Sequence, residues 1–506
     1  MAITRRWFIG GAASFGAFGG NRFCTCFGAE TEETPELRLG VVSDIHVNEY
    51  GSDVKTWGTD LFKSVLEYYR DRKVDAVVIP GDLADQGYGA GLRAVAKVWY
   101  EVFPNDRAPD GRKVEKVFVF GNHDFGGAWY TDWWKKHYAN EAERHADNLR
   151  LHPEKLWREA FNEEYAPFYR KEIKGFTFFG QHWDNGSRQQ ESGKVYPFGD
   201  LLKEHLVDTR NRPDPAKPFF YVQHPHPKNT CYGPWAWGHD DGVSTEVLSA
   251  FPNAIAFSGH SHYALTDERT IWQGAFTSAG CSSLRYGALP YDEMMPSGYE
   301  NSGAGRNSWE RDALKMMSPY RGCRNVHQAT VWSVYKDRIV VNRVDFPSRL
   351  SIGPDWVMPL PSAEPPPFAF AERAKKTKPP EFPVGAKLRV EFVKAKTRGS
   401  RSPDRKHEIK PVEKDAFKVV IPPALVKEEA RVWRYRIEVG SLTDPQVKYV
   451  VAAGFGSRIE DPEVFRATEC VFAYDEIPRK NNQIITVTPE NCFGQQGRPL
   501  TFRGKL

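Results

Sequence analysis

The chain has few cysteines, no long apolar run and little net charge, and each shortage excludes a class of protein. Seven cysteines in 506 residues are too few for a disulfide scaffold. No segment approaches the ~20 consecutive apolar residues of a membrane-spanning helix. The formal charge is only +4, from 69 Lys and Arg against 65 Asp and Glu. This balance argues against nucleic-acid binding across the whole surface, and we predict no specific nucleic-acid partner.

The composition is that of a globular protein of two or three domains. Hydrophobic residues make up 40% of the chain, and 15 Trp, 21 Tyr and 32 Phe provide large apolar surfaces to bury. The charge is uneven, because residues 371–410 carry 13 Lys and Arg against 5 Asp and Glu. We interpret this stretch as a solvated segment, with contact to an anionic surface as the alternative.

The first residues resemble a bacterial twin-arginine export signal. Thr4-Arg5-Arg6 precedes Phe8-Ile9 and a short stretch rich in Gly, Ala and Phe. A Sec signal or a membrane anchor is the alternative, but the apolar run is too short to span a bilayer. We therefore expect a signal peptide over 1–29, the twin-arginine export machinery as a partner, and a periplasmic or secreted protein.

Five cysteines remain if Cys24 and Cys26 are removed with this segment. Cys470 and Cys492 fall in the same C-terminal region and could pair in an oxidising compartment. The sequence does not set the distance between them, so a disulfide and two free thiols both stay open.

Apolar runs and helical spacing alternate along the first part of the chain. Buried strands are predicted at 37–42, 74–80 and 117–120, with helices over 61–69 and 92–102 between them. This alternation indicates parallel βαβ units, whose functional residues collect at the carboxyl ends of the strands.

The same pattern returns after an aromatic and charged insertion at about 125–217. Within the insertion, helices are predicted near Trp133 and over 154–169, and a strand is predicted at 176–179. Two further buried strands are predicted at 219–222 and 254–257, and alternation over 330–346 predicts an antiparallel hairpin.

A proline-rich segment separates this region from a second kind of pattern. Its proline density predicts a stiff linker over 351–380. Beyond it, strict alternation at 387–392 and 433–439 predicts an all-β sandwich domain over 381–506, of immunoglobulin or fibronectin type. Such a module could contact a glycan or an envelope polymer.

Polar clusters stand at the ends of five predicted strands. Mixed carboxylate, amide and imidazole groups suit Mn, Fe or Zn, and the lack of thiolates argues against a structural zinc site. The clusters supply Asp44, His46, Asp82, Asn122, His123, Asp124, His224, His260 and His262.

These clusters resemble the motif series of the calcineurin-like metallophosphoesterases. The matching motifs are Asp44-x-His46, Gly81-Asp82, Gly121-Asn122-His123-Asp124, His224 and Gly259-His260-x-His262. The resemblance implies an α/β (α+β) domain over 37–350, made of two packed mixed β-sheets flanked by helices. It also implies two divalent or trivalent metal ions, whose identity (Mn, Fe or Zn) the sequence leaves open.

The resemblance also implies a ligand set. One metal would take Asp44, His46 and His262, the other Asn122, His224 and His260, and Asp82 would bridge them. His226 competes with His224 for its place, and we favour His224 because it lies nearest the strand end.

The implied reaction is hydrolysis of a phosphomonoester or phosphodiester by in-line attack of a hydroxide that the metals share. His123 would assist the leaving group and Asp124 would orient its imidazole, or Asp124 would only cap the loop. The alternative is an inactive phosphoesterase-like surface protein that binds glycan or envelope polymer.

Substrate features are fewer, and they are consistent with a small-molecule, lipid or nucleotide phosphate ester. The segment 232–239, which contains Trp237, could form an aromatic wall or a packed loop. His182 and Asp184 end a predicted strand and could touch substrate, and Arg285 could meet a phosphate or form an ion pair.

Overall fold

The fold is that of a computed structural model, in which Pro35–Leu506 form one unit. The predicted signal segment, Trp133, Asp184 and, within the segment 232–239, Trp235 lie outside the described residues. The structure describes residues 33–47, 59–130, 138–183, 197–234, 236–288, 309–317, 326–402, 406–426, 431–440, 445–458, 460–477 and 481–506.

A seven-stranded mixed sheet carries the first three motifs. Its order is β12-β11-β10-β1-β2-β3, with β13 paired to β11. β1, β2 and β3 are parallel, and the predicted hairpin β10–β11 pairs antiparallel to β1. The strands are β1 Leu37–Val41, β2 Ala76–Pro80, β3 Glu115–Val119, β10 Gln328–Val334, β11 Arg338–Asp345, β12 Leu350–Ser351 and β13 Trp356–Pro359.

A six-stranded mixed sheet carries the remaining motifs, in the order β4-β5-β6-β7-β9-β8. β5, β6, β7 and β9 are parallel and the two edge strands are antiparallel. The strands are β4 Phe168–Ile173, β5 Phe176–Gln181, β6 Phe219–Val222, β7 Ala254–Ser258, β8 Ile271–Gln273 and β9 Thr277–Gly280.

The two sheets pack face to face over a shared apolar core. The ring of Phe257 meets that of Trp332 edge-on at 4.8 Å between centroids, and Phe220 stacks beside Phe257. Alternate residues such as Phe219 and Tyr221 point to the other face, into a core with α7 and α8. Burial on both faces explains why these strands are continuously apolar, with each large side chain contributing ~1.5–3 kcal/mol.

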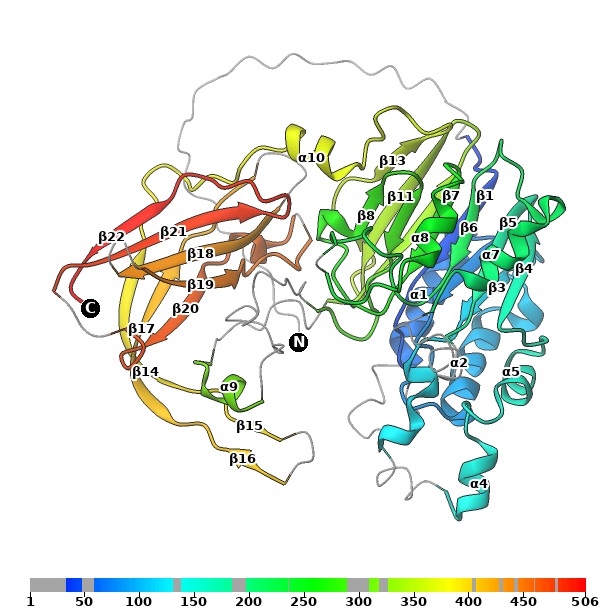
Figure 1. The fold of residues 1–506 in the computed structure, drawn as a ribbon, viewed down its shortest axis with the longest axis horizontal. Helices are drawn as coiled ribbons and strands as arrows, with labels where there is room; N and C mark the ends of the chain where they lie inside the picture. Colours follow the sequence, from blue (N-terminus) through cyan, green and yellow to red (C-terminus); the bar gives the residue numbers. More distant parts are fainter. Residues whose placement is uncertain are drawn as a thin grey trace, which may run out of the picture. The chain divides into compact units, whose positions relative to one another are not determined.

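Helices cover the outer faces of both sheets (Figure 1). In α1, Phe62, Val65, Leu66 and Tyr69 recur at helical spacing and are buried against the first sheet with α2 and α5. The helices are α1 Thr59–Asp71, α2 Gly89–Val102, α4 Glu141–Ala146, α5 Pro153–Phe161, α7 Asp200–Val207, α8 Val243–Leu248, α9 Trp309–Leu314 and α10 Phe370–Lys376. Short 3-10 helices are η1 Pro104–Asp106, η2 His123–Tyr130, η3 Thr209–Asn211, η4 Glu268–Thr270 and η5 Pro462–Phe465. Within the described residues, none of the helices has the length and apolar character needed to cross a membrane.

Two expectations about single segments are wrong. The helix predicted over 154–169 ends at Phe161, because Asn162 adopts a left-handed conformation with φ 53°, and β4 begins at Phe168. The segment 351–380 is not a plain linker, since β13 pairs with β11 and Arg373 of α10 forms a buried ion pair with Glu268.

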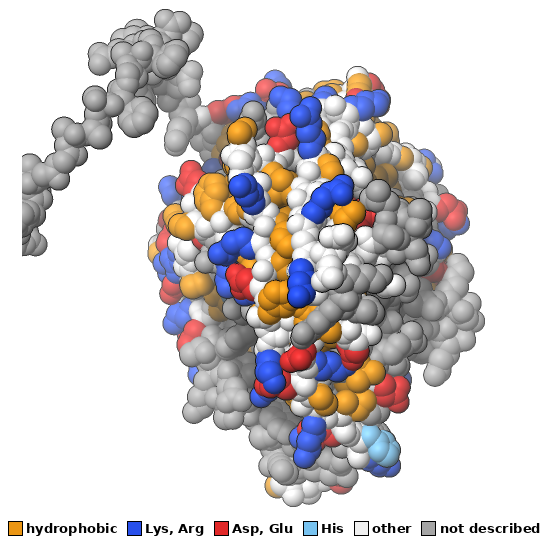
Figure 2. All heavy atoms as spheres, turned by 90° about the vertical axis from the view of Figure 1, so that its left-hand side faces the viewer, with side chains coloured by type: hydrophobic (Ala, Val, Ile, Leu, Met, Phe, Trp, Pro, Cys, Tyr) orange, Lys and Arg blue, Asp and Glu red, His pale blue; other side chains and the backbone are white. Residues whose placement is uncertain are grey.

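The C-terminal region is antiparallel throughout its described strands. A three-stranded sheet, β14-β17-β20, and a four-stranded sheet, β19-β18-β21-β22, share one apolar core, and β15 and β16 form a short pair. Figure 2 shows Lys and Arg side chains spread over one face, with hydrophobic side chains between them. The strands are β14 Arg389–Lys396, β15 Ser400–Arg401, β16 Glu408–Ile409, β17 Glu413–Ile421, β18 Val432–Gly440, β19 Pro445–Val451, β20 Thr468–Ala473, β21 Gln483–Asn491 and β22 Leu500–Gly504.

The observed architecture thus confirms two packed mixed sheets with helices, followed by antiparallel β-sheets. The immunoglobulin or fibronectin type of the second part stays a prediction. Cys470 and Cys492 are both buried, and no disulfide joins them in this structure.

Candidate metal centre

Five loops that follow parallel strands meet at one edge of the two sheets. Parallel strands place their carboxyl ends together, which brings residues far apart in sequence into one site. The loop after β1 supplies Asp44 and His46, the loop after β2 supplies Asp82, the loop after β3 supplies Asn122, His123 and Asp124, the loop after β6 supplies His224, and the loop after β7 supplies His260 and His262.

Left-handed backbone conformations concentrate in these loops. Non-glycine residues rarely adopt positive φ, and each such residue costs on the order of 1–3 kcal/mol. The φ values are 50° at Asp44, 45° at His46, 54° at Asp82, 69° at His260 and 57° at His262. The surrounding fold therefore holds five of the expected ligands in conformations that the chain would not adopt alone.

Glycines before two motifs allow the loops to approach closely. A Cβ at Gly81, which has φ 98°, would stand 2.2 Å from His224 Nδ1. A Cβ at Gly121 would stand 2.2 Å from Asp82 Oδ1. Any larger residue at these positions would displace an expected ligand.

One half of the site gathers Asp44, His46 and His262, all buried. His262 Nε2 lies 2.9 Å from Asp44 Oδ1 and 3.1 Å from His46 Nε2. His46 Nε2 lies 3.5 Å from Asp82 Oδ2. One ligand atom from each of these four residues lies within 4.8 Å of the others, a spacing that one metal ion can span.

The other half gathers His224, Asn122 and His260 beside the same aspartate. His224 Nε2 lies 3.2 Å from Asp82 Oδ2 and 3.1 Å from Asn122 Oδ1, and the His224 and His260 ring centroids are 4.8 Å apart. Burial lowers the pKa of His224, but the charge and hydrogen bond of Asp82 raise it to about 9. Oδ2 of Asp82 therefore faces a histidine from each half.

Three of the histidines are oriented through their outer ring nitrogen. An oxygen that can only accept holds the proton on that nitrogen and leaves Nε2 facing the site. The pairs are His46 Nδ1 with Asp85 Oδ1 at 3.1 Å, His262 Nδ1 with the Tyr286 carbonyl oxygen at 3.2 Å, and His224 Nδ1 with the Pro80 carbonyl oxygen at 2.7 Å.

The half made by Asp44, His46 and His262 is suited to a cation at its centre. With their protons directed outward, His46 and His262 present two Nε2 lone pairs to each other, next to the carboxylates of Asp44 and Asp82. Burial and the charge of His123 lower the pKa of His46 to about 4, so a proton does not supply the charge on that ring near neutral pH. The donor set and its geometry fit a dimetal site.

His123 lies beside this cluster and is held by Asp85, which the motif comparison missed. His123 Nδ1 is 3.2 Å from the Asp85 carbonyl oxygen and 3.4 Å from Asp85 Oδ1, and Arg285 forms an ion pair with Asp85 Oδ2 at 2.7 Å. Burial lowers the pKa of His123, but the charges of Asp82 and Asp85 raise it to about 9. Arg285 therefore forms an ion pair, which was the alternative to phosphate contact.

The expected role of Asp124 as the group that orients His123 is wrong. Its carboxylate is fully buried and accepts backbone N–H groups of Leu83, Ala84 and Gly121 at 3.2, 2.7 and 2.7 Å. Burial and the charge of Asp82 raise its pKa to about 7. Asp124 thus ties the loop after β2 to the loop after β3, as a loop cap would.

Two other sequence candidates lie outside the cluster. His226 contacts Ser258 Oγ and Ser261 Oγ, each at 2.7 Å, so both its nitrogens are engaged away from Asp82. His182 accepts from the Phe120 backbone N–H at 3.0 Å and is packed among aromatic rings. The geometry therefore favours His224 over His226 and gives His182 a packing role.

Solved structures similar to the chain include three with TM-scores of 0.35 or lower. A dimetal phosphatase from Danio rerio is 13% identical and covers 64% of this chain and 98% of that chain, with a TM-score of 0.35. A predicted phosphoesterase from Streptococcus pneumoniae TIGR4 is 13% identical and covers 63% and 97%, with a TM-score of 0.22. Vps29 complexed with zinc, from Entamoeba histolytica, is 9% identical and covers 64% and 99%, with a TM-score of 0.27. No protein of curated function matches the chain.

A family model gives a more direct assignment. The model of the calcineurin-like phosphoesterases matches residues 37–264, a range that begins at β1 and ends two residues after His262. All seven expected metal ligands fall within it. Residues 37–264 are therefore a calcineurin-like metallophosphoesterase domain with buried Asp and His residues at its metal site.

Proposed function

We propose that this domain hydrolyses phosphate esters with two bound metal ions, and that His123 transfers a proton to the leaving oxygen. The observation that carries the proposal is the position of Asp82. Its Oδ2 lies 3.5 Å from His46 Nε2 and 3.2 Å from His224 Nε2, between the two halves of the site. A carboxylate in this place can serve two cations at once.

When bound, two such metal ions neutralise phosphoryl oxygens and make a water nucleophilic near neutral pH. The chain's own residues supply the proton for the leaving group. Because the Asp85 carbonyl oxygen holds His123 Nδ1, Nε2 is the nitrogen available for proton transfer. The backbone N–H of His123 donates to Asp82 Oδ1 at 2.8 Å, which couples the acid to the bridging residue.

The alternative, an inactive surface protein, would be expected to have lost part of this machinery. All seven expected ligand residues are present, and ligand atoms of four of them lie within 4.8 Å of one another. This convergence at strained backbone positions supports an active enzyme.

Asp82→Asn tests the proposal. Asn keeps the size of the side chain but loses the charge that two cations share, so we expect metal content to fall and hydrolysis of bis-p-nitrophenyl phosphate to drop by at least about 100-fold. Elemental analysis and product release are measured on the same protein, after loading with Mn, Fe or Zn in turn.

Asp110→Asn is the matched control, because this carboxylate is about half exposed on the same domain. It should retain metal and activity. Full activity of Asp82→Asn, or a wild-type protein that binds metal and hydrolyses no ester, would contradict the proposal.

A further inference from the structure

Two exposed aromatic rings border the metal centre. Among the described residues, four aromatic side chains are exposed: Trp237 at 38%, Tyr286 at 40%, Phe392 at 64% and Phe465 at 61%. The last two belong to the C-terminal sheets and their loops. The first two each contact a histidine of the candidate metal site.

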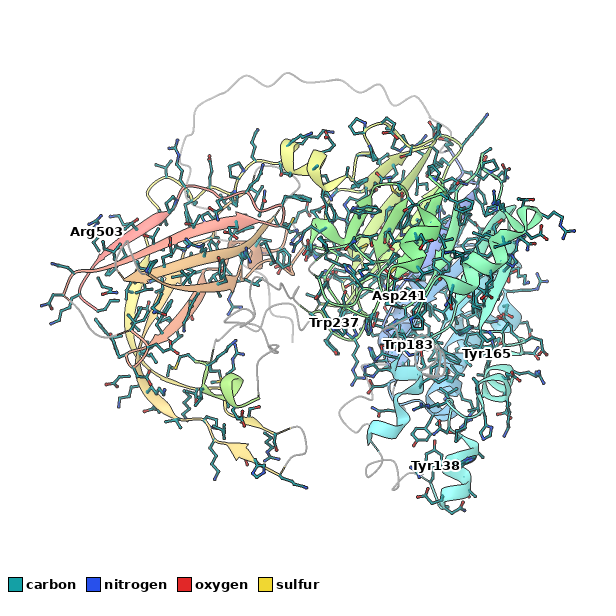
Figure 3. All side chains as sticks on the ribbon, in the orientation of Figure 1. Tyr138, Tyr165, Trp183, Trp237, Asp241 and Arg503 are labelled. Carbon is teal, nitrogen blue, oxygen red and sulfur yellow. The ribbon has the colours of Figure 1, made fainter. Side chains whose placement is uncertain are left out.

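Trp237 lies flat against His260. Their ring centroids are 4.5 Å apart with an interplanar angle of 27°, and Trp183 packs against His260 and His224 at 5.6 and 5.8 Å. Trp237 comes from the loop after β6 and Trp183 follows β5, so both stand at the carboxyl ends of neighbouring strands (Figure 3). One face of Trp237 is thus occupied by His260, while the ring keeps a substantial exposed area.

The loop that carries Trp237 is held at both ends. The His226 N–H donates to the Gly238 carbonyl oxygen at 2.8 Å, and the Asp240 N–H donates to the His226 carbonyl oxygen at 2.8 Å. The buried Asp240 carboxylate accepts the backbone N–H groups of Lys228 and Gly242, each at 2.9 Å. Tyr232 of the same segment is fully buried. The loop therefore presents Trp237 in a set position, which lowers the entropy cost of binding against it.

Trp237 and the proposed acid His123 contact histidines of different halves of the site. His123 contacts His46 at 4.6 Å between ring centroids, and Tyr286 contacts His262 at 4.4 Å, so both belong to the half made by Asp44, His46 and His262. Trp237 belongs to the half made by His224 and His260. A leaving group that takes its proton from His123 would depart from the first half, which leaves the second half for the substituent that stays on phosphorus.

We propose that Trp237 stacks on a planar, aromatic or heteroaromatic, substituent that stays on phosphorus, so that the preferred substrate is a phosphodiester. This inference rests on the proposed function. A flat exposed ring favours a flat partner, because offset stacking of two π-faces adds to the burial of area. A phosphomonoester has no second substituent and gains nothing from Trp237.

Three substrates with the same leaving group test this inference. Bis-p-nitrophenyl phosphate keeps a planar group on phosphorus, ethyl p-nitrophenyl phosphate keeps an alkyl group, and p-nitrophenyl phosphate keeps none. We compare kcat/KM of the metal-loaded wild type, Trp237→Leu and Trp237→Phe. Leu retains apolar packing on His260 without the flat face, so the aryl-to-ethyl ratio should fall about ten-fold, mainly through KM, and Phe should restore most of it.

Phe465→Ala is the matched control, since it removes an exposed ring from another part of the chain. It should leave all three rates unchanged. An unchanged aryl-to-ethyl ratio in Trp237→Leu overturns the inference, and so does an equal loss on all three substrates, which would mean that Trp237 only supports His260. A metal-loaded wild type that hydrolyses none of the three would instead contradict the proposed function.

Discussion

The structure buries two groups of charged side chains. In one group a carboxylate is paired with arginines of the same chain, whereas in the other histidine nitrogens and carboxylates face one another. Glu268, Arg343 and Arg373 are each at most 3% exposed. Arg343 lies 2.8 Å from Glu268 Oε1, Arg373 pairs with Oε2, and Trp356 Nε1–H donates to Oε2 at 3.1 Å. Both carboxylate oxygens of Glu268 therefore have a cationic partner from the same chain.

The metal centre is arranged differently. His46 and His262 direct their protons outward to Asp85 and Tyr286 and turn lone pairs toward each other and toward carboxylates. Its residues also adopt strained backbone conformations. The comparison teaches that a buried carboxylate paired with cationic side chains of the same chain supports the fold, whereas buried lone pairs and carboxylates that face one another mark a place where a cation can bind.

The largest effect on stability should come from removing the Glu268 carboxylate. Glu268→Ala leaves two buried guanidinium groups without their carboxylate, so the free energy of unfolding should fall by about 3–5 kcal/mol. Urea denaturation followed by tryptophan fluorescence measures it. Glu101→Ala is the control, because its ion pair with Lys63 is about 40% exposed on both sides and should cost less than ~1 kcal/mol. Equal losses in the two variants would contradict the claim that the buried ion pairs of Glu268 stabilise the fold more than an exposed ion pair does.

Acidification should reduce the contribution of Glu268 to the unfolding free energy of the wild-type protein. Burial raises the pKa of Glu268, but Arg343 and Arg373 lower it to about 2, below the ordinary value of 4.5. The stabilisation is therefore fully present above pH 4.5 and is lost as pH falls toward 2, by roughly 3 kcal/mol in total. The difference in unfolding free energy between wild type and Glu268→Ala should narrow over this range. A difference that stays constant over this pH range would contradict the claim that Arg343 and Arg373 lower the pKa of Glu268.

Asp85→Asn tests the same comparison at the metal centre. The variant weakens the hold on His46 and His123, so metal affinity or kcat should fall by about 10- to 100-fold. Its unfolding free energy without metal should fall by less than that of Glu268→Ala, because Arg285 and His123 are 22% and 28% exposed and keep access to water. Metal titration and denaturation of the metal-free protein give both numbers. A large loss of stability with unchanged metal affinity would mean that Asp85 supports the fold, as Glu268 does, and does not support the metal site.

Much of the fold of the metallophosphoesterase domain could be predicted because its signals are local. The runs at 219–222 and 254–257 correspond to β6 and β7 almost residue for residue, since strands buried on both faces are apolar without interruption. The ligands could be placed because each follows such a strand directly. Parallel pairing then brings the five ends together.

What could not be predicted depends on contacts between distant residues. Asp85 stands four residues after Gly81 in an ordinary loop, and only the approach of His46 and His123 gives it a role. The spacing Gly81-Asp82-x-x-Asp85 was the available signal. Asp124 carries the same kind of side chain, yet its oxygens serve backbone N–H groups, and no local pattern separates these two uses of a carboxylate.

The course of the chain through β13 and α10 bears on how such proteins could be recombined. A crossover near residue 351 would remove an edge strand from the first sheet and one of the two arginines that pair with Glu268. A crossover after Lys376 would keep both. Exchange of the C-terminal region between related genes should therefore be tolerated at the end of the proline-rich segment and selected against at its start.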